Sequence, residues 1–158
     1  MKIFMTVFCL TVLTTDCAST KVGLSTLKPK VENNVFIYKK YTRGFYNEFH
    51  IGEEKITSYL NYQKTEISEK STAKKDWEYC LKLLNDIDLK NFSDLKAPSN
   101  LRQTDRVLHG ALTLKIKEKD FIASCHFDHG NPPEKIKILV EHLLYISCLL
   151  YTSDAADD

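Results

Sequence analysis

The segment from Gly110 to Phe127 constrains the fold more than any other part of the sequence. In two stretches, GALTLKI and FIASCHF, every second residue is small or apolar, and the polar stretch KEKD separates them. This pattern predicts a β-hairpin, and its register matters because a one-residue slip would turn every side chain to the wrong face. Pairing Ile116 with Phe121 gives one apolar face, the predicted core face, made of Gly110, Leu112, Leu114, Ala123, Cys125 and Phe127.

Three further strand-like segments lie upstream, within residues 35–62. They read VFIYKKYT, GFYNEFHI and KITSYLNY, and they are rich in β-branched and aromatic residues. Gly44 and the pair Gly52-Glu53 separate them, as hairpin turns do. The sequence therefore predicts a three-stranded meander before the first helix.

Two segments have the helical period instead. In the first, Ser71 or Thr72 is the expected N-cap, and one apolar stripe is formed by Trp77, Cys80, Leu81, Leu84 and Ile87. The second opens with NPPE, in which Asn131 is the expected cap and Pro132 the first helical residue. Its apolar stripe is formed by Ile136, Leu139, Val140, Leu143 and Ser147.

These elements predict an α+β domain over residues 35–147. Their order is β-β-β-α-β-β-α, and the hairpins imply antiparallel pairing. We expect one antiparallel sheet of about five strands, with two helices on one face and the other face open to solvent.

Residues 1–19 have the organisation of a secretory signal peptide. A lysine precedes an apolar run from Ile3 to Leu13, which is shorter than the roughly 20 residues that span a bilayer as a helix. Two kinds of processing are open, namely cleavage after Ser19 and lipidation of Cys17 as in bacterial lipoproteins. Residues 20–34 are polar and aperiodic, and we expect a tether there.

Composition excludes some classes of function. The chain has a net charge of +1, and about +4 once the predicted signal and the last eleven residues are set aside, without a run of five like charges. This is not the basic footprint of a nucleic-acid-binding protein. The five glycines are scattered, so no phosphate-binding loop and no cofactor is predicted. Cys80 and Cys125 are expected as two buried free thiols, with a disulfide as the alternative.

The last eleven residues, 148–158, read as an addition to the natural sequence. CLLYTSDAADD follows directly on the helix-like run KILVEHLLYIS. It resembles the conceptual translation of a transposase-type sequencing adapter, which spells the same eleven residues in one frame. We therefore expect an adapter-derived artefact here and place the natural boundary at Ser147.

Three segments between residues 76 and 133 carry a resemblance to known proteins. DWEYCLKLLNDIDL, LKAPSN followed by TD, and FDHGNPP resemble a small family of uncharacterised exported proteins and lipoproteins of bacterial cell envelopes. FDHGNPP is the most specific of the three. The resemblance implies a periplasmic protein or an outer-membrane lipoprotein, and it brings no catalytic residue to this chain.

The predicted hairpin also gathers the residues best suited to a metal. Its register puts His109, His126 and Asp128 on the face away from the core, and two imidazoles with a carboxylate suit zinc or another divalent ion. The competing interpretation is structural: Asp128 caps the HGNPP turn through its side chain, and the histidines lie on a solvated sheet. His129 is expected on the opposite face.

Two functions follow from these features. The first is a non-enzymatic envelope module that binds a protein or ligand through its open sheet face, where exposed aromatic residues would mark the surface. The candidate aromatic residues are Tyr38, Tyr41, Phe45, Tyr46, Tyr59 and Tyr62. The second is a metal-dependent enzyme that uses His109, His126 and Asp128. The sequence does not decide whether the protein is an enzyme.

Overall fold

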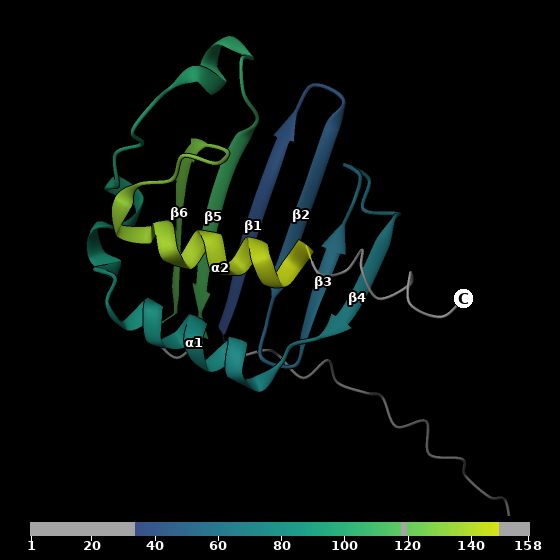
Figure 1. Cartoon of the computed structure of the whole chain (residues 1–158), viewed down its shortest axis with the longest axis vertical. Coiled ribbons are helices and arrows are strands. Elements are labelled where there is room, and N and C mark those ends of the chain that lie inside the picture. Colours follow the sequence, from purple (N-terminus) through teal and green to yellow (C-terminus); the bar gives the residue numbers. More distant parts are fainter. Residues whose placement is uncertain (1–33, 118–119, 149–158) are drawn as a thin grey trace, which may run out of the picture. The chain divides into compact units, whose positions relative to one another are not determined.

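A six-stranded antiparallel sheet forms the body of the computed structural model, which describes residues 34–117 and 120–148. Neighbouring strands lie in the order β4-β3-β2-β1-β5-β6, and Figure 1 shows them side by side. Their bounds are β1 Asn34–Thr42, β2 Phe45–Ile51, β3 Lys55–Tyr59, β4 Ile67–Ser71, β5 His109–Ile116 and β6 Phe121–Asp128.

The sheet has one strand more than the sequence predicted. The additional strand is β4, which pairs with β3 at one edge of the sheet. Its sequence, ISEKS, has no side chain that becomes fully buried, and even Ile67 is 56% exposed. An edge strand of this kind lacks the apolar face on which recognition of a strand from sequence depends.

The predicted register of the β5–β6 hairpin is confirmed. Ile116 pairs with Phe121, and the pairing continues without a slip to His109 opposite Asp128. The predicted core face is buried. Gly110 belongs to this face because a Cβ there would lie only 2.9 Å from the Phe127 ring, so the strand and the ring approach each other closely.

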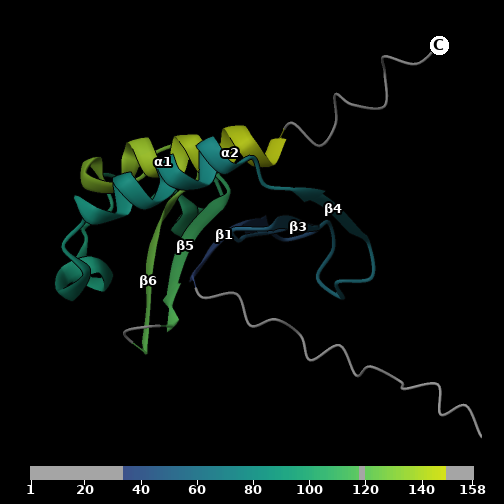
Figure 2. The ribbon, with the colours of Figure 1, turned by 90° about the horizontal axis from the view of Figure 1, so that it is seen from below.

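Two helices, α1 (Lys74–Asn85) and α2 (Lys137–Cys148), cover the same face of the sheet. Figure 2 shows both on one side, so the predicted α+β architecture is confirmed. The helical stripes face the core as expected, since the residues that α1, α2 and the turn before α2 bury there include Trp77, Cys80, Leu84, Ile136, Leu139, Val140 and Leu143.

Both predicted helix caps are wrong, because their side chains bind elsewhere. Helix α1 begins after Ala73, and the Thr72 hydroxyl donates to the Gly52 carbonyl across the sheet edge instead. Before α2 the chain makes a short 3₁₀ turn, η4 (Glu134–Ile136). The Asn131 side chain donates to Ser99 rather than to the helix.

The two cysteines of the core, Cys80 and Cys125, are buried and free. Burial raises the pKa of Cys80 to about 12 and that of Cys125 to about 11, so both are neutral thiols that pack as apolar groups. This agrees with the expectation of two buried thiols.

Several predictions fall outside the described residues. These are the signal peptide 1–19 with Cys17, the tether 20–34 except for Asn34, and the adapter segment 148–158 except for Cys148. Asn34 begins β1, and Cys148 is the last residue of α2. Within the described ranges, neither helix has the length and apolar character needed to cross a membrane.

Candidate functional site on the open face of the sheet

The candidate site lies on the face of the sheet opposite α1 and α2, which we call the open face. Side chains of alternate residues point to it from every strand. The strand registers align one row of these residues across the sheet from β3 to β6, namely Tyr59, Glu48, Lys39, Ala111 and His126. This row places a carboxylate, an ammonium group, a methyl group and an imidazole next to one another.

Glu48 is the most unusual member of this row, because it is only 2% exposed although α1 and α2 both lie on the other side of the sheet. Its carboxylate accepts hydrogen bonds from the Tyr46 hydroxyl, from His50 Nε2 and from Lys64 Nζ, the last at 3.0 Å. Lys39 Nζ lies 3.5 Å away. A buried carboxylate needs such partners, since an unpaired one costs several kcal/mol.

These partners keep Glu48 ionised. Burial by itself would raise its pKa, but the hydrogen bonds from His50, Tyr46 and Lys64 and the charge of Lys39 outweigh burial and hold the pKa well below its usual range. The same contact raises the pKa of Tyr46, together with the larger effect of burial on that hydroxyl. The cluster is therefore a carboxylate held among neutral and cationic donors.

The loop between β3 and β4, residues 60–66, folds onto the open face and supplies Lys64 to this cluster. A turn in which the Asn61 side chain bonds Thr65 shapes the loop, and Lys64 takes a left-handed conformation with φ of 55°. The Tyr62 hydroxyl donates to the carbonyl of Thr42 at 2.8 Å. Contacts at Lys64 and Tyr62 thus attach the loop to the sheet at two points.

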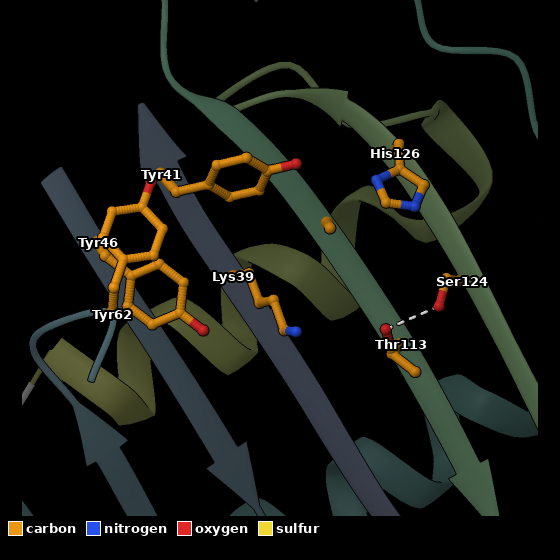
Figure 3. Close-up of a pocket in the computed structure, with 8 residues that line it drawn as sticks. Lys39, Tyr41, Tyr46, Tyr62, Thr113, Ser124 and His126 are labelled. Carbon is orange, nitrogen blue, oxygen red and sulfur yellow. Dashed lines mark hydrogen bonds between the residues drawn. The ribbon is translucent and has the colours of Figure 1, made fainter. Parts of the chain in front are cut away.

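A hollow of about 290 Å³ lies beside the cluster, between β1, β5 and β6. Figure 3 shows the Tyr46 and Tyr62 rings together on one side, Tyr41 along another and His126 opposite them. Ala111, which lies between Lys39 and His126 in the row, lines the hollow with only a methyl group. The lining residues are Lys39, Tyr41, Tyr46, Tyr62, Ala111, Thr113, Ser124 and His126.

Ring contacts hold the aromatic walls of the hollow in place. The Tyr46 and Tyr62 rings lie 4.4 Å apart between centroids. Tyr41 stacks on His109 at 4.9 Å with an angle of 15° between the ring planes. The rings are therefore positioned before any ligand arrives, which reduces the entropy lost on binding.

The structure does not bring the predicted metal ligands together. His109 stacks on Tyr41, and His126 lines the hollow one row away. Asp128 is 2% exposed and turned to other partners. Within residues 34–117 and 120–148, no group of three His, Cys, Asp or Glu residues is close enough to hold a metal ion.

Asp128 has a structural role that differs from the predicted one. Its carboxylate accepts from Ser99 Oγ, from the backbone N–H groups of Leu101 and Arg102, and from the Arg102 guanidinium at 3.0 Å. It therefore anchors the short helix η2 (Leu101–Thr104) rather than the HGNPP turn. Burial opposes ionisation, but these donors hold the pKa of Asp128 well below its usual range.

The predicted aromatic surface is only partly on the open face. Tyr41, Tyr46 and Tyr59 lie there, and Tyr62 reaches it from the loop with 52% of its surface exposed. Tyr38 is instead fully buried under the helices. Its hydroxyl shares a hydrogen bond of 2.7 Å with His129 Nδ1, so His129 lies on the core side as expected. Phe45 is 40% exposed.

Sequence reasoning missed Glu48, Lys39 and Lys64 as members of one cluster. The segment FYNEFHI indicated that Tyr46, Glu48 and His50 share a face of the sheet. It did not indicate that other side chains bury Glu48 on that face. The covering group comes from a loop 16 residues later, which no local pattern reveals.

No protein-family model matches this chain, and no curated protein is similar to it. The resemblance to exported envelope proteins therefore rests on the three quoted segments alone.

Replacing Glu48 by glutamine tests the cluster. Glu48→Gln leaves Lys39 and Lys64 without their carboxylate, and we expect a loss of about 2 kcal/mol in the free energy of unfolding. Urea denaturation measures this loss. Glu53→Gln, in the exposed turn between β2 and β3, is the control and should change stability by less than about 0.5 kcal/mol. Equal stability of the two variants would contradict the role given to Glu48.

Proposed function

We propose that this protein is an exported or lipid-anchored binding protein of the cell envelope, and that it holds a small ligand in the hollow of the open face. The proposal of a ligand site rests on the hollow. Three tyrosines, a lysine, two hydroxyl groups and an imidazole line the hollow together with the methyl group of Ala111. Ligand sites typically combine apolar walls with a few convergent polar groups in this way.

The polar groups of the hollow favour binding over catalysis. Thr113 and Ser124 bond to each other at 2.8 Å, so neither hydroxyl is paired with a histidine or a carboxylate that would activate it as a nucleophile. Glu48, which lies 3.5 Å from the lining residue Lys39, is buried and already accepts three hydrogen bonds. Such a carboxylate is poorly suited to accept a proton from a substrate.

The envelope location is supported by the apolar run of Ile3–Leu13, by the position of Cys17 and by the resemblance of the FDHGNPP segment to exported proteins. A binding module on a tether suits an envelope protein, since the domain then reaches ligands at a distance from its anchor. The two halves of the proposal are independent, and each has its own test.

Filling the hollow tests ligand binding. We expect a fragment library, screened by ¹H–¹⁵N NMR, to yield ligands that shift the amide signals of Ala111, Thr113 and His126. Ala111→Leu fills the space without removing a polar group and should abolish these shifts. Ala73→Leu, at an exposed position before α1, is the control and should keep them. Fragments that bind Ala111→Leu as well as the unchanged protein would contradict the site.

Intact mass of the protein expressed from its native locus tests export. We expect either a membrane-extracted species that begins at Cys17 with added acyl mass, or a soluble species that begins at Thr20. A species that retains Met1 would contradict export by the predicted signal peptide.

A further inference from the structure

The hollow carries a net positive charge. Lys39 is the formally charged residue among the eight that line it, and Figure 3 shows its side chain directed toward Thr113. Lys39 is only 3.5 Å from Glu48, but Glu48 also accepts a hydrogen bond from Lys64. Two ammonium groups thus share one carboxylate. One positive charge is left at the edge of the hollow for a ligand to compensate.

The polar groups that line the hollow also offer hydrogen-bond donors. Within the described residues, neither the Tyr41 hydroxyl nor the His126 ring has a hydrogen-bond partner in the protein. Thr113 and Ser124 use one of their two hydroxyl protons for the bond between them, so the other proton is available. Donors on several sides of a cationic hollow favour a ligand rich in acceptor oxygens.

The size and the walls of the hollow restrict the rest of the ligand. Its volume of about 290 Å³ is at the lower end of small-molecule sites, which begin at about 300 Å³. This is space for one ring and its substituents. The Tyr46–Tyr62 pair and the Tyr41 ring present aromatic surface on two sides, against which a flat ring packs well.

We infer that the hollow recognises a single six-membered ring that bears a carboxylate. The carboxylate lies against Lys39, with the hydroxyls of Thr113 and Ser124 within reach, and the ring packs against the tyrosines. The inference rests on the proposed function and adds the charge and the size of the ligand. Sugar acids and aromatic acids share this chemistry, so the test uses one of each.

The experiment is an NMR titration of the full-length protein with two acids and their neutral analogues. D-Glucuronate is compared with D-glucose, and 4-hydroxybenzoate with 4-hydroxybenzamide. For at least one acid we expect a Kd of about 1 mM, as is usual for a single ring. Its neutral analogue should bind about tenfold more weakly, because it lacks the charge-assisted bond to Lys39. The acid that binds more tightly shows whether the hollow prefers a sugar acid or an aromatic acid.

Three variants test whether Lys39 causes the preference for the acid over its neutral analogue. Lys39→Met should weaken binding of the acid about tenfold and make its affinity equal to that of the neutral analogue. Lys39→Arg keeps the charge and should largely preserve binding of the acid. Lys115→Met removes an exposed lysine of β5 that lies on the same face of the sheet but outside the hollow, and it should leave binding unchanged. Unchanged spectra away from the hollow show that each variant is folded.

Three results would overturn the inference. The first is binding of a neutral analogue as tight as that of its acid, and the second is an acid affinity that Lys39→Met does not reduce. The third is the absence of any shift at Ala111 and His126 with all four probes at about 20 mM, a concentration well above the Kd expected of a single ring. The proposed function would still hold if other fragments bind in the hollow of the unchanged protein but not to Ala111→Leu. Failure of this inference and failure of the proposed function are therefore distinguishable.

Discussion

The ionised carboxylate of Glu48, buried on a sheet face that the described helices do not cover, is the interaction on which the open face depends. A charge that is removed from water costs several kcal/mol unless its partners replace the lost hydration. Here the partners come from three places in the chain: Lys39 on β1, Tyr46 and His50 on β2, and Lys64 on the β3–β4 loop. The carboxylate therefore connects two strands and a loop on this face.

This arrangement explains how the hollow is formed. The loop that carries Lys64 to Glu48 also carries Tyr62 to Tyr46, so one tethered segment supplies both a cation and a wall. On the other side, Ala111 lines the hollow with a small side chain, and Tyr41 stacks on His109. The β5–β6 hairpin and the β3–β4 loop thus supply walls on either side of β1, and the site depends on elements from most of the sheet.

Local patterns in the sequence predicted those parts of the fold that have one clear apolar face. The β5–β6 register was predictable because GALTLKI and FIASCHF tolerate one alignment only. The strand β4 was not, since its exposed residues lack such a face. Tyr38 was misplaced because VFIY is apolar at every position, so alternation gives no direction there. The caps failed because Thr72 and Asn131 bind partners 20 and 32 residues away.

The candidate site was harder to predict than the fold, for a related reason. Periodicity shows which face a side chain occupies, but convergence on Glu48 depends on where a loop folds back. Asp128 illustrates the same point, because its carboxylate is occupied by Ser99 and Arg102, some 26 to 29 residues earlier in the chain. Such long-range partners convert an apparent metal ligand into an anchor for η2.

The pKa of Glu48 tests the central claim most directly. It can be measured from the pH dependence of the side-chain carboxyl ¹³C shift. A folded-state pKa below the unfolded value means that ionised Glu48 stabilises the fold above about pH 4, and that this stability is lost as the pH falls toward the folded-state value. The account predicts that Glu48 stays ionised well below the usual pKa of about 4.3 for glutamate. Titration of Glu48 at or above that value would contradict it.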